Sequence, residues 1–398
     1  MDPYRCRKHL LKFLQKFLVR DHPQVPKTRD TCNGRSPGGF FPPSYPRPVP
    51  VHAALTEYYR NKKPHRQCDC MNAEIVQLTS EARTIAGTLD AIRNEMKTVI
   101  VGQNDVIDRL LMAVCADGHV LLEGVPGIAK TLTIRTLSQC MDCSFTRLQF
   151  TPDLLPADIM GTKIYNQKDS TFSTVKGPVF SNFILADEIN RAPPKVQSAL
   201  LEAMQEKQVT IQGETHTLAR PFFVLATQNP IESEGTYPLP EAQVDRFMFK
   251  VLMTYPEKAD EVTILDRFTE GIAIEPKKVI SSAQILAIQA FTRKVYADPS
   301  IKRYVSEIVD ATRHPATYGI DEGRYIALGA SPRASIFLIL GGKARALLAG
   351  RGYVIPEDIK AVAHDVLRHR IILNYEGEAD GITTDAIIDR ILGTVKVP

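Results

Sequence analysis

The chain has 398 residues, more than one ordinary hydrophobic core requires, so we expect two or three folded units. Its hydrophobic fraction of 44% and charged fraction of 24% are typical of globular proteins, and no apolar run is long enough for a transmembrane segment. The net charge of +4 comes from residues 1–70, which hold 14 Lys and Arg against 5 Asp and Glu, whereas the slightly acidic remainder argues against a body that binds nucleic acid.

Residues 1–70 contain ten prolines and differ in composition from the rest of the chain. This density leaves little room for helices or strands, so we predict a disordered, Pro-rich, basic extension. Basic residues alternate with leucines and phenylalanines over residues 8–20, a pattern that fits a membrane surface or a partner protein. An alternative is that translation begins at Met71, in which case the extension does not occur in the physiological protein.

Apolar residues recur at helical spacing from Met71 to Met112, with an interruption at residues 99–103. This pattern predicts two helices joined by a short extended segment. A buried strand is predicted at residues 119–122, and the Gly-rich segment 124–131 leads from it into a further helix. Strand, Gly-rich turn and helix form the context that a phosphate-binding loop requires.

The Gly-rich segment has the composition of such a loop. Glycines let backbone N–H groups converge on phosphate oxygens at a helix N-terminus, where the helix dipole also favours negative charge. We expect Lys130 to pair with the β- and γ-phosphates and Thr131 to bind Mg²⁺. Ala129 stands where the general pattern has Gly, so the motif alone leaves an ordinary Gly-rich turn open. The expected nucleotide-contacting residues are Gln103, Gly124, Val125, Pro126, Gly127, Ile128, Ala129, Lys130 and Thr131.

Two later strands end in polar side chains. The buried strand at residues 183–186 leads to Asp187 and Glu188, which fits a Walker B site where Asp187 holds Mg²⁺ and Glu188 polarises the attacking water. The strand at residues 222–226 leads to Asn229, whose amide could contact the γ-phosphate and the same water. The alternatives are solvated acids at a strand end and an Asn-Pro turn. The sequence has no Asn-Lys-x-Asp element for reading guanine, which favours ATP.

Four strings carry a resemblance to a known family, namely DEINRAPPK at 187–195, LLEAMQE at 200–206, ATQNP at 226–230 and LPEAQVDRF at 239–247. They closely resemble the MoxR family of AAA+ ATPases, whose phosphate loop also has the alanine found here at position 129. The likeness runs from about Met71 to the C-terminus.

The resemblance implies an α/β fold in which a doubly wound parallel sheet of the AAA+ P-loop type is followed by a C-terminal helical lid domain. We place the nucleotide-binding domain at residues 71–256 and the lid at residues 257–398. The lid helices are expected near residues 282–295, 332–349 and 356–370. Two β-rich inserts, at 171–180 and 209–218, are expected near a ring pore, where they would contact substrate.

The resemblance also assigns roles to two arginines. Arg246 matches the arginine that reaches a neighbouring subunit's nucleotide in related ring ATPases, and such a finger contributes about 10³ to 10⁵ in rate. Arg333 matches the second sensor, with Ser331 as N-cap and Pro332 at the first helical position, and is expected to point at the γ-phosphate of its own subunit. The alternatives are a local ion pair of Arg246 with Asp245 or Glu241 and a solvent-facing Arg333.

The implied cofactors are ATP and Mg²⁺, and the implied assembly is a homo-oligomeric, hexameric ring. The implied function is remodelling, assembly or metal-cofactor insertion for an unidentified client, beside a partner with a von Willebrand A-type domain. Two rival functions stay open, a nucleic-acid motor related to ring helicases and a nucleotide-gated scaffold with little turnover. The acidic body disfavours the first, and intact Lys130, Asp187 and Glu188 disfavour the second. Seven irregularly spaced cysteines favour reduced thiols in the cytoplasm.

Overall fold

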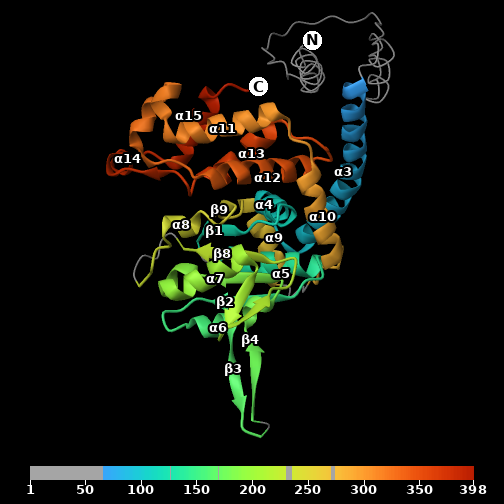
Figure 1. Cartoon of the computed structure of the whole chain (residues 1–398), viewed down its shortest axis with the longest axis vertical. Coiled ribbons are helices and arrows are strands. Elements are labelled where there is room, and N and C mark those ends of the chain that lie inside the picture. Colours follow the sequence, from blue (N-terminus) through green and yellow to red (C-terminus); the bar gives the residue numbers. More distant parts are fainter. Residues whose placement is uncertain (1–65, 126, 169, 230–234, 270–273) are drawn as a thin grey trace, which may run out of the picture. The chain divides into compact units, whose positions relative to one another are not determined.

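The computed structural model describes residues 66–125, 127–168, 170–229, 235–269 and 274–398 (Figure 1). Its contacts divide the chain into Met1–Lys63 and Pro64–Pro398, and the description below concerns the second unit. The expectations for the basic extension and its amphipathic pattern lie outside the described residues, apart from the first turn of one helix. That helix, α3, spans Arg66–Val99 and so begins five residues before the predicted start of globular structure.

A five-stranded parallel sheet forms the centre of this unit, as expected. Its order is β2-β5-β8-β1-β9, with bounds β1 Val120–Gly124, β2 Phe145–Gln149, β5 Phe183–Asp187, β8 Phe223–Gln228 and β9 Phe249–Met253. The strands β5, β8 and β9 are mostly apolar because both faces of the sheet are covered, whereas the edge strand β2 has the more polar sequence FTRLQ. Val120 and Leu122 face one hydrophobic core while Leu121 between them faces another, so the sheet is doubly wound.

Helices cover the two faces. The helix α3, together with α4 Asn104–Cys115 and α5 Lys130–Cys140, contributes to the first core, whereas α6 Pro156–Met160 and α7 Pro194–Glu206 contribute to the second. A short helix, α8 Glu241–Val244, precedes β9. The break between α3 and α4 falls at residues 100–103, which confirms the predicted pair of helices.

Two hairpins are inserted around the sheet. The hairpin of β6 Gln208–Ile211 and β7 Glu214–Thr217 confirms the predicted one, with Gly213 at its turn. The other pairs β3 Gly161–Asn166 with β4 Thr171–Lys176 and extends away from the sheet (Figure 1). The predicted insert covered only the β4 side. The strand β3 could not be predicted from the alternation of apolar and polar residues, because none of its side chains is buried in a core.

The C-terminal part is largely helical, and the three predicted helices are confirmed. Its elements are α9 Lys258–Thr269, α10 Ser282–Lys294, α11 Pro299–Arg313, α12 Pro332–Leu348, α13 Pro356–Leu367, α14 Tyr375–Ala379 and α15 Thr384–Thr394, with the short strands β10 Ile326–Leu328 and β11 Ile372–Leu373. The helix α11 was not predicted. Within the described ranges, no helix is both long and apolar enough to cross a membrane.

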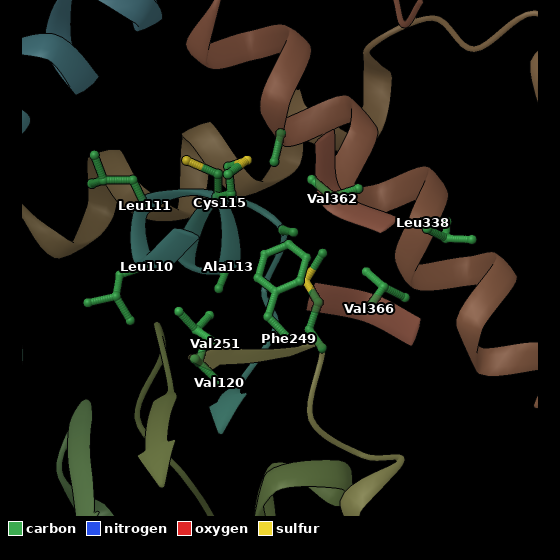
Figure 2. Close-up of a cluster of buried hydrophobic side chains, with 14 of the residues drawn as sticks. Leu110, Leu111, Ala113, Cys115, Val120, Phe249, Val251, Leu338, Val362 and Val366 are labelled. Atoms are coloured by element: carbon green, nitrogen blue, oxygen red, sulfur yellow. The ribbon is translucent and has the colours of Figure 1, made fainter. Parts of the chain in front are cut away.

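The first core continues from the sheet into the C-terminal helices. Figure 2 shows the Phe249 ring of β9 between α4 and the helices that carry Leu338, Val362 and Val366. Gly341 on α12 permits this approach, since a Cβ there would lie 3.3 Å from both the Phe249 ring and Val362. The predicted boundary at residue 256 therefore separates two parts that share one core.

We expect Phe249→Ala to lower the free energy of unfolding by about 3–5 kcal/mol, because the fully buried ring would leave a cavity in the shared core. Urea denaturation of the full chain measures this. Tyr375→Ala is the matched control, since that ring is 84% exposed and its loss should cost less than about 0.5 kcal/mol. Equal stability of the two variants would show that this core does not hold the C-terminal helices to the sheet.

Candidate functional site

The carboxyl edge of the sheet gathers the predicted nucleotide site. The strands β1, β5 and β8 are adjacent and parallel, so the segments that follow them meet at the same edge. This register brings together the loop after Gly124, the pair Asp187 and Glu188, and Asn229, which is 8% exposed. Gln103 lies at this edge as well, where its side chain donates to the Thr254 carbonyl, 2.9 Å away.

The loop backbone is shaped to leave N–H groups open. Gly127 and Ala129 have positive φ angles of 84° and 61°, and Ala129 occupies the N-cap of α5 without any side-chain acceptor. The first N–H groups of α5 therefore retain their capacity to bind an anion. Gly124 is required by packing, because a Cβ there would lie 2.8 Å from the Met253 carbonyl. Pro126 lies outside the described residues.

Lys130 is a half-buried cation among carboxylates. Its ammonium donates to the Gly124 carbonyl across the loop. Burial lowers the pKa of Lys130, while the charges of Asp187, Glu188 and Glu123 oppose that shift. The three carboxylates therefore help to keep the ammonium charged where the loop N–H groups converge, an arrangement suited to phosphate oxygens.

Thr227 contacts both residues of the acidic pair, Asp187 through its carboxylate and Glu188 through its backbone N–H. Its hydroxyl donates to Asp187 Oδ1 at 2.7 Å and accepts from the Glu188 N–H at 2.9 Å. Glu188 is in the left-handed region at φ 56°, which turns the chain sharply as β5 ends. The other oxygen of Asp187 accepts from the Arg147 guanidinium at 2.6 Å. A carboxylate oriented in this way and the Thr131 hydroxyl are the hard oxygen ligands that suit Mg²⁺, so these residues fit the metal.

Glu188 has side-chain partners of its own. Its Oε2 accepts from Gln149 Nε2 at 3.0 Å and pairs with Arg191 Nε at 3.0 Å. Sequence reasoning assigned no role to Gln149, Arg147 or Thr227. The two residues on β2 could be found only after its pairing with β5 was known, since Gln149 lies opposite Asp187 in that register.

The two predicted arginines lie at the opposite, amino edge of the sheet. Arg246 comes just before β9, and the Met248 N–H donates to the carbonyl of His119, the residue before β1, at 2.8 Å. Arg246 Nη1 donates to the Leu201 carbonyl at 2.9 Å, and its buried Nε has no partner within the described part of the chain. The five residues of β9 span about 16 Å at about 3.3 Å each, which separates Arg246 from the loop of its own subunit.

Arg333 lies beside Arg246, which corrects one expectation. Its Nη1 pairs with Asp245 Oδ2 at 3.3 Å and its Nη2 contacts Gln205 Oε1 at 3.4 Å. The expected N-cap is present, because the Ser331 hydroxyl accepts from the Arg333 N–H. The guanidinium nevertheless does not point at the phosphate loop of its own subunit, because the packing of α12 places the start of that helix at the amino edge.

The alternative of a local ion pair of Arg246 with Asp245 or Glu241 is not observed in the described structure, where Arg246 donates to the Leu201 carbonyl. Asp245 is engaged by other groups, accepting from Arg370 Nε at 2.7 Å and from the Ser331 hydroxyl at 2.9 Å. Arg333 itself is 41% exposed at its side chain, so its pairing with Asp245 leaves it accessible to a partner.

Known proteins similar to this chain share both of its parts. The model of the ATPase family associated with various cellular activities (AAA) matches residues 119–249, and an AAA lid domain model matches residues 321–391. The chain is 48% identical to Chaperone MoxR1 of Mycobacterium tuberculosis over 313 residues, which are 78% of this chain and 82% of that protein. It is 32% identical to Protein MoxR of Methylorubrum extorquens over 76% of this chain and 93% of that one. A crystal structure from Cytophaga hutchinsonii is 53% identical, with a TM-score of 0.76 and coverage of 80% and 97%.

We expect Thr227→Val to lower ATP turnover about 10- to 100-fold, because hydrogen bonds to charged groups contribute about 1.5–3 kcal/mol and 1.36 kcal/mol corresponds to tenfold. Steady-state phosphate release measures the effect. Binding of a fluorescent ATP analogue should persist, because Lys130 and the loop are untouched. Thr84→Val, at an exposed position on α3, is the control. Full turnover in Thr227→Val would mean that the Asp187 carboxylate and the Glu188 backbone are held in place without this hydroxyl.

Proposed function

Because the chain belongs to the MoxR family of AAA+ ATPases, we propose that it hydrolyses ATP in a homo-oligomeric ring and uses that energy to remodel client proteins. The family match covers the sheet and the lid, in agreement with the AAA+ fold described above. A chaperone name is carried by the relative from Mycobacterium tuberculosis, which supports an action on other proteins.

The carboxyl edge supplies the ATP-binding half of the reaction. Loop N–H groups and Lys130 hold the phosphates, while Thr131 and Asp187 hold Mg²⁺, which when bound neutralises charge on the phosphate oxygens. Glu188 accepts hydrogen bonds from the attacking water and orients it toward the terminal phosphate. We assign to Asn229, which follows the adjacent strand β8, a contact with the same water and phosphate, and its place beside the end of β5 supports this.

The observation that carries the proposed ring is the position of Arg246. This arginine lies at the amino edge, about one strand length from its own phosphate loop. An arginine finger must contact the transferring phosphoryl group, so Arg246 requires the nucleotide of another subunit. The buried Nε without a partner in the described structure is a donor still available for such a contact.

Arg333 belongs to the same half of the reaction in this proposal. It is joined to the Arg246 segment through Asp245, so we assign it to the neighbouring subunit's nucleotide as well. A lid helix and the loop before β9 would then move together when the neighbour's nucleotide changes, which couples hydrolysis to movement of the lid.

The assembly and its partners rest on the family resemblance. We propose a hexameric ring in the cytoplasm, a partner with a von Willebrand A-type domain, and clients that are remodelled, assembled or loaded with a metal cofactor. The β3–β4 hairpin suits contact with clients, since Ile164 and Phe172 on it are 51% and 68% exposed.

We expect the ATPase rate per subunit of the full chain to rise with protein concentration, because a lone subunit lacks a finger for its own nucleotide. Arg246→Ala should lower turnover at least about 10³-fold at every concentration while ATP still binds. Arg303→Ala, at an exposed site on α11, is the matched control and should behave like the wild type. A rate independent of concentration, together with a harmless Arg246→Ala, would show that the active site is complete within one subunit.

A further inference from the structure

A cavity of about 190 Å³ at the amino edge is lined by three cationic side chains, Lys207, Arg246 and Arg333. They come from three separate segments, since Lys207 caps α7, Arg246 precedes β9 and Arg333 begins α12. Asp117 and His119 also line this amino-edge cavity. The proposed function accounts for the two arginines and leaves Lys207 without a role.

Lys207 is held in place but its ammonium is weakly bonded. It has a left-handed φ of 53° at the C-cap of α7, and its side chain is only 16% exposed. Its Nζ lies 3.3 Å from Asp117 Oδ1 and 3.5 Å from the Phe222 carbonyl. A charge-assisted hydrogen bond of this kind is normally about 2.7–2.9 Å long, so both contacts are long.

His119 cannot satisfy Lys207, although its Nε2 lies 3.3 Å from Nζ. His119 Nδ1 accepts from the Val224 N–H at 3.1 Å, so that nitrogen carries no proton. The ring proton is then on Nε2, which faces the Met204 carbonyl at 3.2 Å. Burial, and next the charge of Lys207, lower the pKa of His119 and keep it neutral. Two donors therefore face one another at Nε2 and Nζ.

Asp117 is also shared, because its other oxygen lies 3.6 Å from Arg293 Nη2. The ammonium of Lys207 is thus nearly removed from water. It has three protons to donate, and the oxygen acceptors that the described residues offer are 3.3 and 3.5 Å away, with the Phe222 ring centroid at 5.5 Å. A phosphate oxygen is a stronger acceptor than any of these, and interactions between charges strengthen where water is excluded.

We propose that Lys207 is a third cation acting between subunits, which binds the terminal phosphate of the ATP held by the neighbouring subunit beside Arg246 and Arg333. This inference rests on the proposed function, because the amino edge must face a neighbour's nucleotide. The compact ammonium of Lys207 binds one phosphate oxygen as a point charge, whereas the flat guanidinium groups bind oxygens in pairs. The ligand class is therefore a nucleoside triphosphate presented from outside the chain.

The first experiment compares phosphate release by Lys207→Met, Lys207→Arg and Arg246→Ala, with the exposed Lys97→Met as control. We expect Lys207→Met to lower kcat about 10- to 100-fold, with ATP binding and the urea midpoint unchanged, and Lys207→Arg to recover part of the rate. A full rate in Lys207→Met with a collapsed rate in Arg246→Ala would overturn the inference and leave the proposed function standing. Full rates in both variants would overturn the proposed function itself.

A mixing experiment then separates the two subunits. Lys207→Met retains the phosphate loop, and Lys130→Ala retains the amino edge, so a mixed ring contains active sites with both halves intact. We expect the mixture to exceed the summed rates of its components. No gain on mixing, with each variant folded and oligomeric, would place Lys207 within its own subunit's reaction and overturn the inference.

The pH dependence of kcat distinguishes a lysine that binds phosphate from one that only supports the fold. Burial lowers the pKa of Lys207, the charge of Asp117 opposes that shift, and the charges of Arg220 and Arg293 add to it. Arg246 and Arg333 are the other charged groups that line the same cavity. The cationic form exists below this pKa, so kcat should fall as the pH rises through it. In Lys207→Arg this alkaline fall should move to higher pH, and an unmoved fall would contradict the proposed contact.

Discussion

The position of both amino-edge arginines depends on the buried guanidinium of Arg370. It is 4% exposed and donates to Asp245, to the carbonyls of Phe247 and Met248, and to the Val366 carbonyl of the preceding helix α13. Burial lowers its pKa to about 10, so the group stays charged and must keep these partners. Through them, the turn that follows α13 is hydrogen-bonded to the segment that leads into β9. Asp245, held in this way, accepts a hydrogen bond from Ser331, the N-cap of α12, and pairs with Arg333 in the first turn of that helix.

Under the proposed function, this arrangement divides one reaction between the two edges of the five-stranded sheet. Parallel strands carry the phosphate loop, Asp187 and Asn229 to the carboxyl edge, and the same strands begin at the amino edge beside Arg246. In this proposal, the five-stranded sheet presents half a site at each of its edges. Two copies that meet edge to edge would complete a site, and repetition of that contact leads to a ring or a helical filament.

The local parts of this structure could be predicted from sequence. Continuous apolar runs ending in Gly124, Asp187 and Asn229 predicted both the strands and their polar ends, because each signal lies within a few residues. The strand β3 and the partners Arg147, Gln149 and Thr227 depend on which strands pair and in which register, which is settled by contacts far apart in the chain. The prediction for Arg333 missed its surroundings for the same reason. The start of its helix is a local signal and was predicted, whereas the packing of that helix against Asp245 depends on contacts far apart in the chain.

The left-handed turn at Ala129 has a consequence for how ATP is recognised. An L-residue in this conformation costs roughly 1–2 kcal/mol relative to glycine, and the packing of Gly124 and Ile128 against β9 holds the loop in that shape. The free energy of folding covers this conformational cost, so it does not reduce the free energy of nucleotide binding. The loop is thus preorganised, and an incoming triphosphate loses little of its binding energy to ordering the backbone that receives it.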